Sequence, residues 1–396
     1  MDEKELTEKK PETTDFYDRI MKHLEKRMLF HDELGPPSVC SIGSIIANLK
    51  QREEPFHWVS GDDEDLGLNL TFVAPSGLAK SYCMKQFLHR SKGICPLKSV
   101  FRGKITEAGF IGTRTKEGDE ELGDAFHYRE GILAFNEITN LFFTQQQEHS
   151  SELINQVMEA LSERHVSKRL ASGPIEYDTW VTIWGGVQPK RFDFSQGLGR
   201  RFLHVSRNWT EDDLNKLKYL RLNRDEECML DLKEVQRIRD ELSTAVRTFD
   251  AKEVKWHGSI LKYILDSCES HLQMQLVEKA IIGKEVIDQY ESDVLIIRDS
   301  VQNKDLVNMI LRMQQMVAEG SDVSLLINVL RDLSGGNPIS LGKVWEKFKL
   351  FNYTLSGFQE LVDVCTKLKV VFSTYQESRQ FIQLRKDLQR EREKAK

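Results

Sequence analysis

The sequence predicts an α/β protein whose main part is an open, largely parallel sheet with helices on both faces. Five short apolar runs alternate with helical stretches between residues 67 and 206. From 210 to about 320 the chain is charged and has a helical pattern. In residues 321–386, three helical stretches precede two runs that alternate around a polar turn. We therefore expect a sheet domain, then a helical region, then a small C-terminal domain.

The chain of 396 residues has room for two or three domains of about 100–200 residues each. The expected strands are LNLTFVA, SVFRGKI, GILAFNE, TWVTIW and RRFLHV. Within the N-terminal part we expect two helices separated by a break at Pro36-Pro37. Three helices followed by a hairpin are the order of a winged-helix domain. The expected divisions are a helical N-terminal extension (1–66), an α/β core (67–209), a helical region (210–320), a winged helix (321–386) and a charged tail (387–396).

Composition and charge favour a globular protein that has no membrane segment. Hydrophobic residues make up 40% of the chain and charged residues 30%, and no apolar run approaches the roughly 18 residues of a membrane helix. The polar N-terminus is unlike a secretory signal, so we expect a cytoplasmic or nucleoid-associated protein that is not secreted. The net charge of −6 argues against a wholly basic nucleic-acid binder, so any DNA contact needs a local patch. The six cysteines form no C-x-x-C pair, which predicts buried free thiols.

The stretch TFVAPSGLAKSY, residues 71–82, predicts a buried strand, a loop, and a helix that begins at Lys80-Ser81. Such a loop aims backbone N–H groups and the helix dipole at an anion. It departs from the phosphate-loop pattern G-x-x-x-x-G-K-[ST], because alanine replaces both outer glycines. Lys80 would reach the terminal phosphates of a nucleotide, and the Ser81 hydroxyl would bind Mg²⁺. The alternative is a plain strand-to-helix turn. The candidate nucleotide-binding residues are Ala74, Pro75, Ser76, Gly77, Leu78, Ala79, Lys80 and Ser81.

Three further stretches end in polar residues that suit phosphate chemistry. GILAFNEI predicts a strand that ends in Asn136-Glu137, where an oxygen ligand for Mg²⁺ precedes a carboxylate able to polarise water. WVTIWGGVQP predicts a strand that ends at a Gly-Gly turn, with Gln188 just beyond it. GLGRRF places Arg200 and Arg201 before the last strand, where a guanidinium could stabilise a transition-state phosphate on a neighbouring subunit. Each stretch alone is also compatible with an ordinary strand end or with solvated surface.

In chain order, these four stretches resemble the motifs of AAA+ ATPases over residues 67–320. Within that superfamily the chain is most similar to the minichromosome-maintenance (MCM) helicase branch. The similarity lies in ITEAGFIGTRTKEGDEELGDAFHYREGILAFNE, in VMEALSERHVSKRLASGPIEYDTWVTIWGGVQPKRFD and in QNKDLVNMILRMQQMVAEG. These stretches resemble the segment before Walker B, the hairpin before sensor 1 and the sensor-2 helix.

The resemblance implies an AAA+ P-loop core, a helical lid, ATP and Mg²⁺ as cofactors, a homo-oligomeric ring such as a hexamer, and DNA as a partner. It departs from the family at Ala74, Ala79, Asn136, Gln188 and Lys304, and the family's zinc-bearing N-terminal domain is absent from residues 1–66. The implied roles are Walker A for Lys80 and Ser81, Walker B for Asn136 and Glu137, sensor 1 for Gln188, the arginine finger for Arg201 or Arg200, sensor 2 for Lys304, and a DNA-facing hairpin tip for Ser167, Lys168 and Arg169.

Three functions are compatible with this reading. The leading hypothesis is an ATP-hydrolysing motor that remodels or translocates on DNA, as in replication or a related process. The substitutions at Ala79 and Asn136 also fit a nucleotide-dependent switch or scaffold with slow or no hydrolysis. The third hypothesis is an AAA+ remodeller of proteins, in which Phe110-Ile111-Gly112 would supply an aromatic pore loop.

Overall fold

The protein is described here by a computed structural model, in which the chain forms two compact units, Met1–Met316 and Val317–Lys396. Each unit is considered by itself. The structure describes residues 15–53, 65–74, 80–114, 119–138, 148–170, 173–188, 201–207, 211–222, 231–319, 326, 329–330, 333–334, 337–349, 355–367, 371–376 and 379–384.

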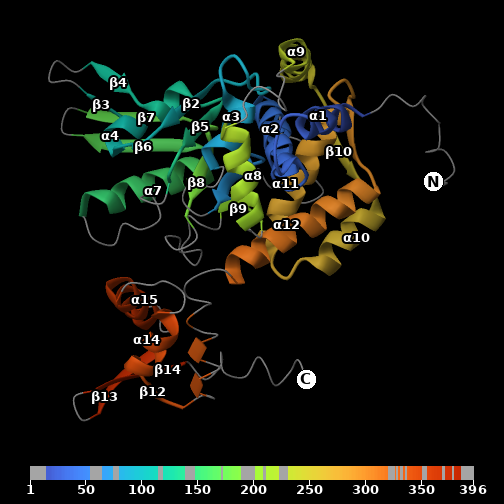
Figure 1. The fold of residues 1–396 in the computed structure, drawn as a ribbon. Coiled ribbons are helices and arrows are strands. Elements are labelled where there is room, and N and C mark those ends of the chain that lie inside the picture. Colours follow the sequence, from blue (N-terminus) through green and yellow to red (C-terminus); the bar gives the residue numbers. More distant parts are fainter. Residues whose placement is uncertain are drawn as a thin grey trace. The chain divides into compact units, whose positions relative to one another are not determined.

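A parallel five-stranded sheet lies at the centre of the first unit (Figure 1). All five expected strands form, so the predicted parallel α/β sheet is confirmed. The first strand in the chain lies between the fourth and the fifth, so the order differs from the order along the sequence. In spatial order the strands are β2 (Ser99–Arg102), β5 (Ile132–Phe135), β8 (Thr182–Val187), β1 (Asn69–Val73) and β9 (Phe202–Ser206).

Helices cover both faces of this sheet, which is why its central strands are apolar on both sides. Trp184 of β8 illustrates one face: its ring packs against Phe72 and Phe87, and its Nε1 donates to Ser41 Oγ at 2.9 Å. Ile183, the neighbouring residue, points to the other face and its separate core cluster. The covering helices are α2 (His31–Glu53) and α3 (Lys80–Leu88) on the first face, and α4 (Glu107–Ile111), α5 (Asp124–His127) and α7 (Glu148–Ser162) on the second.

Two antiparallel hairpins accompany the second face. One pairs β3 (Gly112–Arg114) with β4 (Glu120–Leu122), and the other pairs β6 (His165–Leu170) with β7 (Gly173–Asp178). Residues of the second hairpin, including Val166 and Ile175, belong to the same core cluster as α7.

The N-terminal helices share a core with the sheet. Helix α1 (Phe16–Glu25) packs on α2, and α2 packs along α11 (His271–Asp288). The predicted break at Pro36-Pro37 is wrong, because α2 runs unbroken through both prolines and is buried on every side from Gly35 to Ala47. Tertiary burial here outweighs the two lost N–H donors.

The contact between α2 and α11 depends on two glycines. A Cβ added at Gly43 would lie 1.9 Å from the Gly283 carbonyl oxygen, and one added at Gly283 would lie 2.0 Å from the Cys40 carbonyl oxygen. These distances are far below van der Waals contact, so the two backbones touch directly. Larger residues would push the helices apart.

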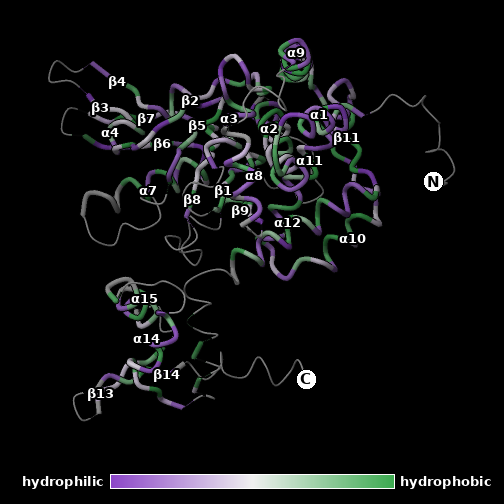
Figure 2. Tube along the Cα trace, in the orientation of Figure 1, coloured by the Kyte–Doolittle hydropathy of each residue, from purple (hydrophilic) through white to green (hydrophobic). Residues whose placement is uncertain are grey.

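The region from 211 to 319 is mainly helical, as predicted, and it shares its core with the sheet through residues such as Ile238 and Ile281. It also contains a parallel strand pair that the helical pattern hid. Figure 2 shows the amphipathic character of its helix α9, which is seen nearly end-on. Its elements are α8 (Glu211–Leu222), α9 (Leu232–Thr248), β10 (Glu253–Trp256), α10 (Gly258–Ser267), α11, β11 (Val294–Ile297) and α12 (Val301–Glu319).

Buried charges join this region to α1. Lys284 Nζ lies 3.0 Å from Asp288 Oδ2, and both side chains are almost fully buried. Arg298 Nη2 lies 2.7 Å from Glu285 and 2.8 Å from Asp288. The backbone N–H of Tyr17 donates to Asp288 Oδ1 at 2.9 Å. Each buried charge has partners, as burial requires.

The second unit contains a three-stranded antiparallel sheet in the order β12-β14-β13, and the expected terminal hairpin is present. Much of the first helix expected in this unit lies outside the described residues. The described elements are β12 (Ile339–Ser340), α14 (Leu341–Lys349), α15 (Leu355–Lys367), β13 (Val371–Gln376) and β14 (Arg379–Leu384).

The five described cysteines are free thiols, and Cys228 lies outside the described residues. Burial raises the pKa of Cys40, Cys83 and Cys95 to about 12. Across the described ranges, none of the helices combines the length and the apolar character that a bilayer crossing demands.

Candidate functional site

The ends of three neighbouring strands form the candidate site. Strands β5, β8 and β1 are adjacent and parallel, so their carboxyl ends meet at one edge of the sheet. From β1 the chain proceeds to β2 at one side of the sheet, whereas from β8 it proceeds to β9 at the opposite side. Ligands in open α/β sheets bind beside such a reversal, at the carboxyl ends of the strands.

Lys80 is the first residue of α3, directly after the loop that leaves β1. Its Nζ donates to the carbonyl oxygen of Ala74, the residue that follows β1, at 2.9 Å. Burial lowers the pKa of Lys80, while the nearby charge of Glu137 acts in the opposite direction. The ammonium group therefore lies at the mouth of the loop and near a carboxylate from the neighbouring strand end.

Ser81 and Asn136 meet across this edge. The Ser81 hydroxyl donates to Asn136 Oδ1 at 2.9 Å, although 55 residues separate them in sequence. Ser81 is partly exposed and Asn136 is exposed, so a ligand can approach both residues.

Glu137 and Gln188 form a second contact between strand ends. Gln188 follows β8 directly, and its Nε2 donates to Glu137 Oε2 at 3.2 Å. Five of the residues predicted from separate motifs therefore lie together at one edge: Lys80, Ser81, Asn136, Glu137 and Gln188.

Two glycines in β8 make this approach possible. The predicted Gly-Gly turn is wrong, because Gly185 and Gly186 lie inside the strand. A Cβ at Gly186 would lie 2.3 Å from the Asn136 carbonyl oxygen and 3.2 Å from Lys80 Cδ. One at Gly185 would lie 2.6 Å from Ile138 Cγ2. The bare backbone of β8 therefore leaves room for both the Lys80 stem and the segment that follows β5.

Several predicted residues are not described. The loop residues Pro75, Ser76, Gly77, Leu78 and Ala79 lie outside the described residues, as does Arg200. The structure therefore places the two ends of the loop, at Ala74 and Lys80.

Arg201 lies at the opposite edge of the sheet. It precedes β9, whose first residue pairs with Asn69 at the start of β1. Its Nε donates to Ser162 Oγ at 2.6 Å, at the end of α7. A five-residue strand spans about 16 Å, so Arg201 is far from Lys80 of the same chain.

Lys304 lies on α12, and its recorded partners belong to the same helical region. Its Nζ lies 2.7 Å from Asp299 Oδ1 and 5.8 Å from the centre of the Tyr263 ring. These recorded partners lie outside the sheet edge that holds Lys80, so the structure does not bring Lys304 together with the other predicted site residues.

The predicted hairpin is present, and Lys168 and Arg169 lie near the end of its first strand, just before the connection. Both lie within β6, paired with Ile175 and Pro174, and the connection comes after Leu170. Lys168 forms an ion pair with Glu107 of α4, whereas Arg169 is exposed. The pairing of β6 with β7 continues to Leu170, beyond the point at which the basic residues suggested a turn.

Phe110 and Ile111 do not form an exposed loop. Both are fully buried in the second core cluster, and the Tyr177 hydroxyl donates to the Ile111 carbonyl at 2.8 Å. The aromatic pore loop proposed for Phe110-Ile111-Gly112 is therefore wrong for this triplet.

The donors at the sheet edge fit Mg²⁺ only together with phosphate oxygens. Ser81 and Asn136 offer a hydroxyl and an amide oxygen, both uncharged, and protein-bound Mg²⁺ commonly takes much of its coordination from phosphates and water. Within the described ranges, no group of three or more His, Cys, Asp or Glu side chains is placed to hold a metal ion. Ser81 and Asn136 would thus hold a magnesium ion that arrives with a nucleotide.

Arg207 is a charged residue near this edge that the motif analysis missed. It follows β9 directly, its Nε lies 3.0 Å from Glu33 Oε2, and its guanidinium stacks 4.0 Å from the Phe30 ring centre. The sequence could have indicated Arg207, because this charged residue directly follows a predicted strand, as the other candidate residues at strand ends do.

The sequence matches no protein-family model and no curated protein.

We expect Gly186→Ala to destabilise the first unit and to disturb the sheet edge that forms the candidate nucleotide site. The added methyl would meet the Asn136 carbonyl oxygen, and overpacking of this kind costs about 1–3 kcal/mol. Nucleotide titration and urea unfolding measure the two effects. The matched control is Gly103→Ala, where nothing lies within 4 Å of the new Cβ. Equal nucleotide affinity in both variants would show that the bare β8 backbone is not needed.

Proposed function

We propose that this protein is an AAA+ ATPase of the MCM-like type, which couples ATP binding and hydrolysis to remodelling of, or translocation on, DNA. One observation supports it above all: Lys80, Ser81, Asn136, Glu137 and Gln188 come from three strand ends and meet at one sheet edge. Separate structural roles would not require these five residues to converge.

Each residue has a chemical role in this proposal. When a nucleotide binds, Lys80 Nζ would give up its hydrogen bond to the Ala74 carbonyl and donate to phosphate oxygens. These are stronger acceptors because they are charged. Glu137 would polarise the attacking water as a general base. Gln188 would hold the Glu137 carboxylate through the amide hydrogen bond already present. Bound Mg²⁺ would neutralise phosphate charge next to Ser81 and Asn136.

Arg201 would act in a ring of identical chains. It lies at the sheet edge opposite to Lys80, so it is suited to a neighbouring subunit's nucleotide and not to its own. A guanidinium supplied in this way stabilises charge that develops in the transition state.

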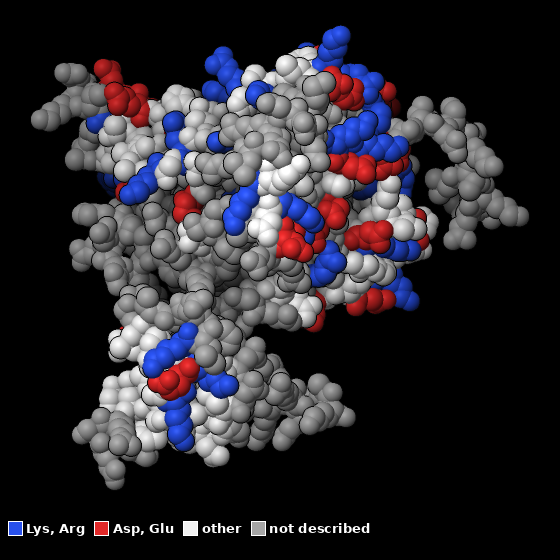
Figure 3. Space-filling view, viewed as in Figure 1, with Lys and Arg blue, Asp and Glu red and all other residues white. Residues whose placement is uncertain are grey.

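DNA contact would involve Arg169 and the second unit. Arg169 is exposed on the β6–β7 hairpin. The second unit has a small antiparallel sheet with α14 and α15, which supports a winged helix. Helix α14 carries exposed Lys343, Lys347 and Lys349, and Figure 3 shows Lys and Arg side chains on this unit. These patches would supply the local positive charge that the whole molecule lacks.

A nucleotide-dependent switch is the second candidate function. Asn136 supplies a neutral ligand where the family has a carboxylate, which favours nucleotide binding with slow turnover. Of the two, we favour the motor because the carboxylate of Glu137 and its Gln188 partner are in place.

ATP turnover with and without single- and double-stranded DNA tests the motor. We expect DNA to stimulate phosphate release, and Glu137→Gln to slow it roughly 10²–10⁴-fold, as loss of a general base does. The matched control is Glu121→Gln, an exposed glutamate on β4. Tight ATP binding without turnover in the wild-type protein would instead establish the switch.

Mixed assemblies test the role of Arg201. Arg201→Ala should keep its ATP affinity but lose turnover by about 10³-fold or more, because an arginine finger acts on the transition state. Mixing this variant with Lys80→Ala should restore some activity, since an intact loop can then face an intact Arg201. Turnover per subunit that is flat on dilution, with no recovery on mixing, would show that each chain acts alone.

A further inference from the structure

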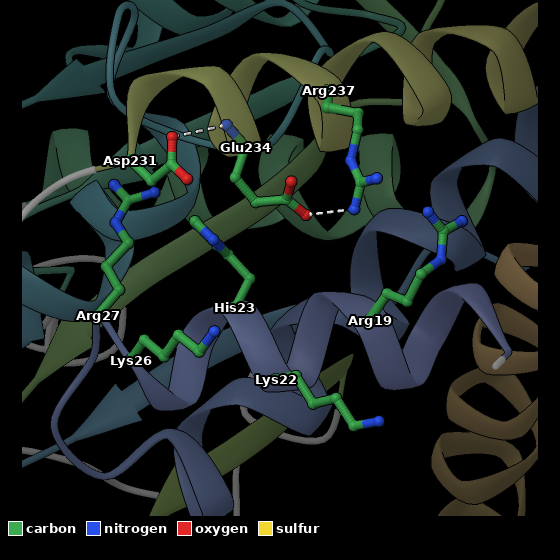
Figure 4. A pocket seen from close by; sticks show the side chains of 8 residues that line it. All are labelled: Arg19, Lys22, His23, Lys26, Arg27, Asp231, Glu234 and Arg237. Atoms are coloured by element: carbon green, nitrogen blue, oxygen red, sulfur yellow. Dashed lines mark hydrogen bonds and ion pairs between the residues drawn. The ribbon is translucent and has the colours of Figure 1, made fainter.

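A basic cavity lies between α1 and the N-terminal end of α9. Its volume is about 370 Å³. Figure 4 shows α1 side chains on one side and α9 side chains on the other. In the space-filling view, Lys and Arg side chains gather over the region of α1 and α9 (Figure 3). The lining residues are Arg19, Lys22, His23, Lys26, Arg27, Asp231, Glu234 and Arg237.

Positive charge dominates this cavity. Five lysine and arginine side chains face two carboxylates of the lining, and Arg19 also pairs with Glu241 outside it, so two positive charges remain uncompensated. Asp231 already caps α9, because its carboxylate accepts from the backbone N–H groups of Lys233 and Glu234. Glu234 in turn binds Arg237 at 2.7 Å. Both acidic residues are therefore committed to partners within α9.

Lys22 and Lys26 are the lysines of the cavity whose ammonium groups can turn toward a ligand. Both are exposed, and neither side chain has a hydrogen bond or ion pair with another residue that the structure describes. Other cations of the lining are held: Arg19 pairs with Glu241, and Arg27 Nε donates to Gln86 Oε1 at 2.8 Å.

His23 gives the cavity a buried recognition group. Only 8% of this residue is exposed, and its Nε2 is buried with no hydrogen-bond partner among the described residues. Figure 4 shows the ring rising from α1 into the space between the two helices. A buried polar atom without a partner is costly, so a ligand that accepts from Nε2 would relieve this cost.

We propose that this cavity binds a small phosphorylated molecule with one or two phosphate groups, held by Lys22, Lys26 and His23. A phosphate carries the charge that the lining leaves uncompensated, and it offers acceptors to Nε2 and to both ammonium groups. The volume lies at the small end of ligand pockets, which suits a small molecule better than a polymer. This site does not depend on the proposed ATPase activity.

The protonation of His23 should respond to the ligand. Burial lowers its pKa most, and Arg27 and Lys26 of the same segment lower it further, whereas Glu234 and Asp231 from α9 raise it. An anion next to Nε2 stabilises the imidazolium, so binding should raise the pKa of His23. Histidine NMR titration with and without inorganic pyrophosphate measures this shift. An unchanged pKa at saturating pyrophosphate would contradict the role of His23.

Calorimetric titration with inorganic pyrophosphate, without magnesium, tests the site itself. The Lys80→Ala protein is used throughout, so that the sheet edge does not contribute. We expect binding, and about tenfold weaker binding after Lys22→Ala and Lys26→Ala are added, because two charge-assisted contacts are lost. Lys85→Ala and Lys262→Ala, both exposed, provide the charge-matched control and should leave binding unchanged. No binding, or equal loss in both double variants, would overturn the proposal.

Discussion

The close approach of three strand ends over a bare backbone is the constraint on which the candidate site depends. Gly185 and Gly186 of β8 lie between β1 and β5, and a side chain at Gly186 would occupy the space of the Asn136 carbonyl and the Lys80 stem. A side chain there would displace the segments that carry Asn136 and Lys80-Ser81, which the Ser81–Asn136 hydrogen bond joins. The chemistry proposed for the edge therefore depends on the two glycines of β8 as well as on the polar side chains at the strand ends.

A second pair of glycines holds the framework behind this edge. The backbone contact between Gly43 and Gly283 brings α2 and α11 together, and α2 in turn covers β1 and β9. Ion pairs of the buried Asp288 carboxylate with the buried Lys284 and with the partly exposed Arg298 extend the same framework to α1, whose Tyr17 N–H also donates to Asp288. Helix α1 then carries His23 into the basic cavity. The sheet, the N-terminal helices and most of the helical region are thus one packed body with two candidate sites.

Much of the sheet could be predicted because its strands are short apolar runs bounded by turns, and parallel strands place their polar ends at one edge. Lys80, Asn136 and Gln188 were grouped beforehand by the chain order of their motifs, through the resemblance to AAA+ ATPases. Prediction from the sequence failed where tertiary packing overrides a local signal. Pro36-Pro37 does not break α2, because burial maintains the helix. The β6–β7 pairing extends past Arg169, and the apolar Phe110 packs in a core where a motif suggested a loop. The cavity around His23 unites segments more than 200 residues apart, which no local pattern indicates.

Calorimetric measurement of Mg²⁺-dependent ATP binding tests the central claim, that this sheet edge is a nucleotide site. Wild-type protein and Lys80→Ala are compared, with Lys85→Ala as the control, because Lys85 is an exposed lysine on the same helix. We predict that wild-type protein and Lys85→Ala bind alike, while Lys80→Ala loses the Mg²⁺-dependent binding because its phosphate contact is gone. Wild-type affinity in Lys80→Ala would contradict the account and leave the loop as a strand-to-helix turn.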